Sequence, residues 1–169
     1  TVMEIDMPAR RLERVKDVFV FCALTGLSYQ GISTLCPSHL FRDDEGTLWI
    51  CRTRAEVAEV GDSCTSRVPL LKPAMVLLEK YRGWNLMNPE GPCFPVPSVQ
   101  KMNEYLKEVA ARCRISKRLT TQMARNTFAA TVTLASRIPK EHVREMLGYS
   151  SDYMLRHYMQ ALERNSQKA

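Results

Sequence analysis

The sequence lacks an apolar run long enough to cross a membrane. Its longest nearly apolar segment, residues 18–27, has ten residues and is interrupted by Thr25 and Gly26, whereas a membrane-spanning helix needs about 20. No secretory signal pattern is present either. We therefore expect neither a membrane protein nor a membrane partner.

The sequence also lacks closely spaced cysteines. Its six cysteines lie at positions 22, 36, 51, 64, 93 and 113, never fewer than 13 residues apart, and the three histidines form no cluster with them. Zinc sites usually contain paired ligands a few residues apart, and disulfide frameworks belong to exported chains. The pattern predicts reduced thiols, no metal site and a cytoplasmic location.

Internal repeats and low-complexity stretches are absent as well. Apolar residues make up 45% of the sequence and charged residues 25%, both near the globular average, which excludes a disordered tail or a collagen-like fibre. A chain of 169 residues can bury about 70% of its unfolded surface in a single core. We expect one domain over residues 1–169.

Positive charge is concentrated near the C-terminal end. The net charge is +6, and residues 101–169 carry 13 basic against 6 acidic side chains, while residues 1–50 carry 5 against 7. Such one-sided charge favours a polyanionic partner, because neutralised phosphates release their counterions. A solvated helix face with no nucleic-acid role would leave the same pattern.

Hydrophobic periodicity and turn residues predict a mainly helical α+β fold. Helices are expected over residues 8–25, 29–35, 73–82, 99–113, 121–136, 139–147 and from 151 onward. Three short strands at residues 40–42, 48–51 and 67–70 should form a small antiparallel sheet that depends on the helices for stability. Residues 83–97, rich in proline, are expected to form a loop.

Four segments, taken in order, resemble the tyrosine recombinases, also called the phage-integrase family. They read TGLSYQGISTL at 25–35, WICRTRAEV at 49–57, TTQMARNTFAATVTL at 120–134 and EHVREMLGYSSDYMLRHYMQ at 141–160. They resemble, respectively, the family's first arginine motif, its lysine-bearing strand, its His-x-x-Arg helix and its Leu-Gly-His stretch ending at the nucleophilic tyrosine. Each is weak alone, but their common order and spacing make the resemblance specific.

The resemblance implies a catalytic-type C-terminal domain that binds double-stranded DNA and associates with itself on DNA. The family's separate N-terminal core-binding domain is expected to be absent from this chain. In the implied reaction a tyrosine hydroxyl attacks a phosphodiester and forms a 3′-phosphotyrosyl bond during recombination or integration by a mobile element. Arginines stabilise the transition state, and lysine and histidine move protons. No cofactor or metal is required.

The residue-by-residue match is uneven. Tyr158 lies at the nucleophile position and Arg125 at the second arginine, while Arg54 takes the place of the lysine. Substituted equivalents are Ser28 for the first arginine, Gly31 for its acidic neighbour, Gln122 for the helix histidine and Tyr149 for the second histidine. Tyr158 could instead be a core tyrosine. Arg125 could be an ordinary arginine on a helix surface, but we expect it to be partly buried.

These substitutions leave the activity open. Loss of one transition-state donor typically costs about 10²–10³ in rate, so an active pocket needs a second cation beside Arg125. Arg54 is the first candidate, Arg52 the second, and Arg42 lies on the neighbouring predicted strand. Three functions remain: a working integrase with a diverged pocket, a DNA-binding relative that does not cleave, and a protein-interaction domain.

A cluster of basic residues is the expected DNA-binding surface. Residues 101–125 carry seven basic side chains against two acidic ones, and this excess should face the duplex as backbone contacts. The residues assigned to it are Lys101, Lys107, Arg112, Arg114, Lys117 and Arg118.

Overall fold

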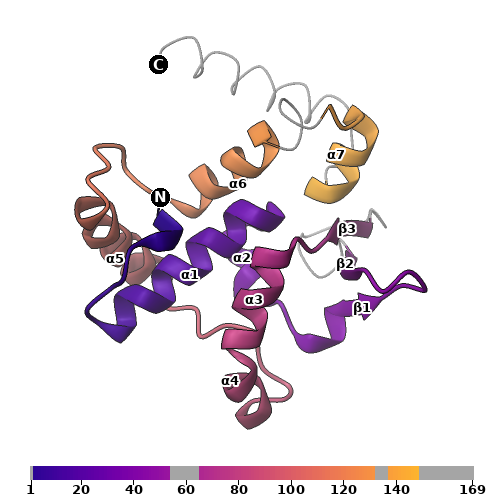
Figure 1. The fold of residues 1–169 in the computed structure, drawn as a ribbon, viewed down its shortest axis with the longest axis horizontal. Coiled ribbons are helices and arrows are strands. Elements are labelled where there is room, and N and C mark those ends of the chain that lie inside the picture. Colours follow the sequence, from indigo (N-terminus) through magenta and orange to yellow (C-terminus); the bar gives the residue numbers. More distant parts are fainter. Residues whose placement is uncertain (1, 54–64, 132–136, 149–169) are drawn as a thin grey trace.

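The computed structural model describes residues 2–53, 65–131 and 137–148. Within these ranges the helices are η1 (Val2–Glu4), α1 (Arg10–Thr25), α2 (Tyr29–Ser33), η2 (Pro37–His39), α3 (Lys72–Lys80), α4 (Arg82–Met87), α5 (Val99–Arg112), α6 (Thr121–Ala130) and α7 (Lys140–Leu147). The strands are β1 (Leu40–Arg42), β2 (Leu48–Thr53) and β3 (Thr65–Pro69) (Figure 1).

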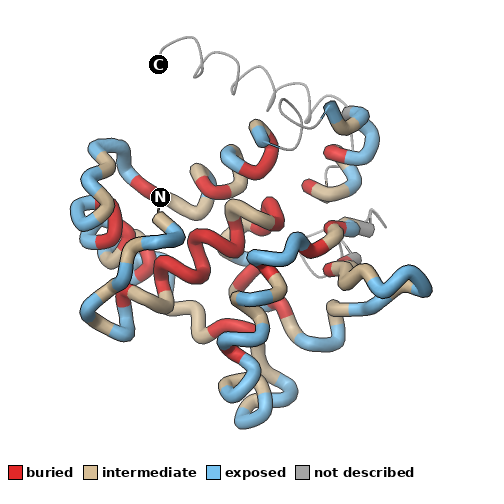
Figure 2. Tube along the Cα trace, viewed as in Figure 1, coloured by how far each residue is buried: buried red, intermediate tan, exposed pale blue. Residues whose placement is uncertain are grey.

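The central element is α1, which is buried along most of its length (Figure 2). It contacts α2, α3, α5 and α6, and its apolar side chains form the main core with α5 and the buried Phe94. The helix ends at Gly26, whose left-handed φ of 73° suits glycine because other residues meet a steric penalty there. The predicted stop at Gly26 is confirmed, while the helix starts at Arg10 rather than Pro8.

The three strands form one antiparallel sheet in the order β1-β2-β3, as predicted. Ile50 of β2 pairs with Leu40 on one side and with Val68 on the other. Because alternate side chains of a strand share a face, Ile50 and Arg52 both point to the buried side and are 1% and 2% exposed. A second, smaller core joins this sheet to α6 and α7 through Val68, Phe128 and Val143.

The hairpin turn and the helix starts follow local signals. Asp43 closes the β1–β2 turn, since its carboxylate accepts hydrogen bonds from the backbone of Thr47 and from the indole of Trp49. The Ser98 hydroxyl caps α5, and the Thr120 hydroxyl caps α6 by accepting from the Met123 N–H. Each cap satisfies an N–H that the helix leaves without a partner.

The expected loop over residues 83–97 is partly wrong, because α4 occupies its first residues. The helix α4 ends before Pro89, the first proline of that segment, so no proline interrupts its hydrogen bonds. The indole of Trp84 then donates to the carbonyl of Pro92 at 3.1 Å and holds the following loop against the helix. Throughout the described ranges, no helix has the length and apolar character required to span a membrane.

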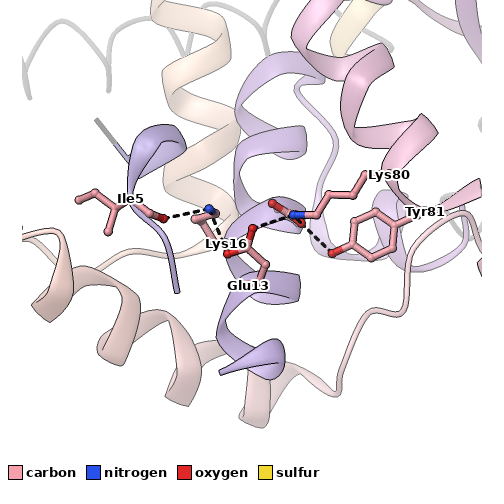
Figure 3. Close-up of polar contacts among 6 residues, drawn as sticks. Ile5, Glu13, Lys16, Lys80 and Tyr81 are labelled. Carbon is pink, nitrogen blue, oxygen red and sulfur yellow. Dashed lines mark hydrogen bonds and ion pairs between the residues drawn. The ribbon is translucent and has the colours of Figure 1, made fainter. Parts of the chain in front are cut away.

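A partly buried ionic cluster fastens α1 to α3 (Figure 3). Lys80 pairs with Glu13 and with Asp17, each at 2.6 Å, and the Tyr81 hydroxyl donates to Asp17 at 2.8 Å. Lys16, only 5% exposed, pairs with Glu13 and donates to the carbonyl of Ile5. Buried charges are tolerated when they are paired in this way.

This cluster predicts that stability falls at both ends of the pH range. Burial acts to raise the pKa of Glu13, but hydrogen bonds from Lys80 and Lys16 outweigh it and lower the pKa below its ordinary 4.5. The contribution of Glu13 is therefore lost as pH falls below 4.5. Burial, together with donation to Asp17, raises the pKa of Tyr81 above its ordinary 10.0, so its contribution is lost as pH rises above that value.

The test compares urea unfolding at neutral pH and above pH 10.0. Tyr81→Phe should lose less stability over this interval than the unmodified protein, because it has no phenol to ionise after unfolding. Tyr105→Phe, on α5 and outside the cluster, is the matched control. An identical alkaline loss in both variants would contradict the assignment.

Candidate functional site

The centre of the candidate site is the segment of residues 26–31, which contains the turn between α1 and α2 and the first residues of α2; we refer to it as the turn of residues 26–31. Gly26 ends α1 by donating its N–H to the carbonyl of Cys22. Two residues later Ser28 caps α2, its hydroxyl accepting from the Gly31 N–H at 3.1 Å. Ser28, which the sequence resemblance predicts to replace the family's first arginine, therefore shapes the backbone of the turn, a role that its short side chain suits.

Arg125 connects this turn to α7. Its guanidinium donates to the carbonyl of Gly26 and, at 2.6 Å, to the carbonyl of Leu147. It is partly buried, as predicted, because Ala124 and Phe128 beside it on α6 face the core. Three of the four motif segments thus meet at one side chain.

The two carbonyls belong to helix ends, which explains why an arginine serves here. The last carbonyls of a helix have no intrahelical partner and carry partial negative charge, so a cation stabilises them. Gly148, with φ of 67°, ends α7 directly after Leu147. The positive charge of Arg125 also acts on Cys22. Burial raises the pKa of the Cys22 thiol to about 12, although Arg125 acts to lower it.

Arg52 holds the other end of the same turn. Its guanidinium donates to the carbonyl of Gly31 at 2.6 Å and to the Thr34 hydroxyl at 2.7 Å. The absence of a side chain at Gly31 makes room for it, since a Cβ there would lie 3.4 Å from the guanidinium and 3.1 Å from Leu27. Arg125 and Arg52 therefore flank residues 26–31 with two permanent positive charges.

Several predicted site residues lie apart from this turn or outside the residues that the structure describes. Gln122 is exposed on α6, and its amide donates to Asn126 at 3.0 Å. Arg42 donates to the carbonyl of Gly46 within its own hairpin. Arg54, Tyr149 and Tyr158 lie outside the described residues.

The six residues predicted to bind DNA are all exposed, but they are spread along the molecule. Lys101 lies in the first turn of α5 and Arg112 is its last residue, about 16 Å apart at the usual rise per residue. The remaining members are Lys107 on the same helix and Arg114, Lys117 and Arg118 in the connection to α6.

The sequence motifs did not indicate that Arg52 holds the backbone of residues 26–31, or that the carbonyl groups of Gly26 and Leu147 accept hydrogen bonds from Arg125. The alternation along β2 carried a signal, because Arg52 shares the face of the apolar Ile50 and not of Cys51. No comparable signal announces a backbone acceptor. Among the described residues, no group of histidine, cysteine or acidic side chains could hold a metal ion.

Comparison with known proteins gives structural matches alone: no family model and no curated protein matches the chain. The XerH site-specific recombinase, in a pre-cleavage complex with difH substrate, has a TM-score of 0.69 at 15% identity, covering 94% of this chain and 46% of its own. The XerA recombinase has a TM-score of 0.66 at 16% identity, and the match covers 94% of this chain and 59% of the XerA chain. The Tn1549 transposon integrase, in complex with a circular intermediate DNA, has a TM-score of 0.62 at 13% identity, and the match covers 89% of this chain and 55% of the integrase chain.

The chain thus spans about half the length of the recombinases that it matches. Identities of 13–16% establish the fold and nothing finer, and the matched architecture is the one described above: a mainly helical domain with a three-stranded antiparallel sheet. This chain has the fold of a tyrosine recombinase catalytic domain.

Proposed function

We propose that this chain is the DNA-binding, catalytic-type domain of a site-specific tyrosine recombinase or integrase. The observation that carries the proposal is the convergence of three motif segments on Arg125, through Gly26 of the first and Leu147 of the last. The XerH and Tn1549 proteins, whose structures contain DNA, support double-stranded DNA as the partner. A core-binding domain outside this chain, self-association on DNA and a cytoplasmic location belong to the same proposal.

In the proposed reaction the Tyr158 hydroxyl attacks a DNA phosphodiester. The new bond joins the tyrosine oxygen to the 3′-phosphate, and the 5′-oxygen leaves with a proton. Arg125 would stabilise the charge of the transition state. Arg54 remains the proposed second cation, because Arg52 is only 2% exposed, whereas Arg125 is only partly buried. We propose Arg52 as a positioning residue.

A DNA-binding domain that does not cleave is the second candidate, and two observations favour it. Ser28 uses its hydroxyl to cap α2 and supplies no cation in place of the first arginine. Gln122, at the helix histidine position, bonds to Asn126 on the exposed side of α6, and an amide cannot transfer protons near neutral pH.

DNA binding is tested by titrating a labelled mixed-sequence duplex at increasing salt concentration. If the six basic residues reach phosphates, affinity should fall on the order of 10³-fold between about 50 and 200 mM salt. Lys117→Glu with Arg118→Glu should weaken binding, whereas Lys72→Glu, an exposed change at the start of α3, should leave it nearly unchanged. Salt-insensitive binding, or none at low salt, would favour the protein-interaction function instead.

Cleavage is tested with a nicked suicide duplex, which traps any covalent protein–DNA adduct. An active domain should give an adduct that Tyr158→Phe abolishes and that Arg125→Lys reduces, with both variants still binding DNA. Tyr158→Phe should leave stability nearly unchanged; a variant that unfolds would identify the hydroxyl as a core hydrogen-bonding group. Salt-dependent DNA binding without any adduct would establish the second candidate.

A further inference from the structure

A groove with an apolar floor and a basic rim lies at the opposite end of α1 from the candidate site. It consists of two adjoining hollows of about 400 and 440 Å³, which share Arg14, Trp84 and Pro95 among their lining residues. We call it the Trp84 groove. Gly26 lies twelve residues beyond Arg14 along α1, about 18 Å at the usual rise, and Figure 1 shows α4 and α6 on opposite sides of α1.

The walls of the groove are preformed. Pro92, Pro95 and Pro97 line it, and proline fixes the backbone φ. The Trp84 indole holds the carbonyl of Pro92, and the Tyr29 hydroxyl donates to the carbonyl of Pro97 at 2.8 Å. A ligand therefore meets a surface that needs little ordering, which lowers the cost of binding.

The floor and one edge of the groove are apolar. Phe94, which is fully buried, and Pro95 belong to the floor. Met87 lines the second hollow and is 84% exposed, and its neighbour Leu86 on α4 is 74% exposed. Exposed apolar side chains beside a concave apolar floor are typical of a surface that receives a side chain of another molecule.

The rim is strongly positive. Its basic residues are Arg10, Arg11, Arg14, Lys80 and Lys101. Glu13 is the acidic residue that lines the groove, and Lys16 and Lys80 already pair with it. Arg11 is likewise paired with Glu108 at 2.9 Å. Within the part of the chain that the structure describes, Arg10, Arg14 and Lys101 form no ion pair.

We propose that the Trp84 groove binds an acidic protein segment that carries a bulky apolar side chain. The apolar residue would occupy the hollow beside Trp84 and Pro95, and the flanking carboxylates would face Arg10, Arg14 and Lys101. A single nucleic-acid strand fits less well, because stacked bases need exposed aromatic faces, and the Arg11 guanidinium lies over the Tyr105 ring, 5.2 Å from its centroid. A partner held here would engage Lys101, one of the six residues proposed to meet DNA, but leaves the other five and the turn of residues 26–31 uncovered.

The test selects binders for the whole chain from a library of random short peptides. Enriched peptides should be acidic and contain a large apolar residue, and the best of them is then titrated against variants by fluorescence polarisation. Arg10→Glu with Lys101→Glu should weaken binding at least about tenfold, since both are exposed and the change replaces attraction by repulsion. Lys107→Glu with Lys117→Glu makes the same charge change outside the groove and should have little effect.

Trp84→Ala should also weaken binding, but it removes a hydrogen bond and can perturb folding, so the surface variants decide the outcome. Enriched peptides without acidic bias, or equal affinity in both charge-reversal pairs, would overturn the proposal. Displacement of the peptide by an oligothymidine strand would identify a nucleic-acid site instead. Self-association of the chain that the Arg10 and Lys101 changes abolish would identify a second copy as the occupant.

Discussion

Replacing Arg125 with alanine is expected to lower the free energy of unfolding by about 3 kcal/mol, because hydrogen bonds to charged groups are each worth about 1.5–3 kcal/mol. The guanidinium serves two carbonyls, those of Gly26 and Leu147, which belong to segments far apart in the sequence. Its loss leaves both helix ends without this donor. Unfolding in urea, followed by circular dichroism, measures the effect.

Arg125→Lys separates the structural role from the charge. Lysine keeps the positive charge, but its single ammonium group does not have the planar fork that reaches two carbonyls at once. We expect this variant to recover only part of the lost stability. Arg118→Ala, which removes an equal charge from an exposed position, should change stability by less than about 0.5 kcal/mol. Unaltered stability in Arg125→Ala would contradict the bridge between the helix ends.

Gly26→Ala should be destabilising by a comparable amount, for two independent reasons. The residue has a φ of 73°, and a Cβ there would lie 2.5 Å from the Phe128 ring and 3.1 Å from Leu147. The backbone conformation costs about 1–2 kcal/mol for a residue with a side chain, and overpacking adds about 1–3 kcal/mol. Phe128 is 4% exposed and belongs to the core of α6 and α7, so the ring cannot move freely.

Gly46→Ala is the matched control for this prediction. Gly46 also has a positive φ, 84°, yet nothing lies within 4 Å of the position that a Cβ would occupy. It should therefore show the backbone cost alone, about 1–2 kcal/mol, and melt at a higher temperature than Gly26→Ala. Equal losses in the two variants would mean that Phe128 yields without cost and that the close packing at Gly26 is not required.

The elements that could be predicted are those with local signals. Ser98 and Thr120 begin helices because their hydroxyls bond a backbone N–H three residues later, and Gly26 and Gly148 end helices because they adopt left-handed φ. The helix α4 was missed because the prolines that follow it suggested a loop. No local signal records that the Trp84 indole reaches across to Pro92.

The sequence motifs indicated which segments belong to the candidate site, but they did not indicate which atoms contact one another there. The spacing of the segments indicated Arg125, whose acceptors are 99 and 22 residues away in the sequence. The sequence named Arg52 only as a second candidate cation, and the structure shows that its guanidinium donates to Gly31 and Thr34. The roles of Tyr158, Tyr149 and Arg54 stay predictions.

The sequence by itself determined most of the helices and strands, though not α4, as well as the order of the motifs and the excess of positive charge in the C-terminal part. The helices and strands depend on hydrogen bonds and side-chain periodicity within a few residues, while the motif order and the charge follow directly from the residue types. Only the tertiary structure decided that Arg52 and Arg125 flank one turn, and that arginines of α1 border a groove with Trp84 of α4. Such arrangements arise when helices and strands pack around a common core, and contacts between residues distant in sequence leave no periodic pattern in it.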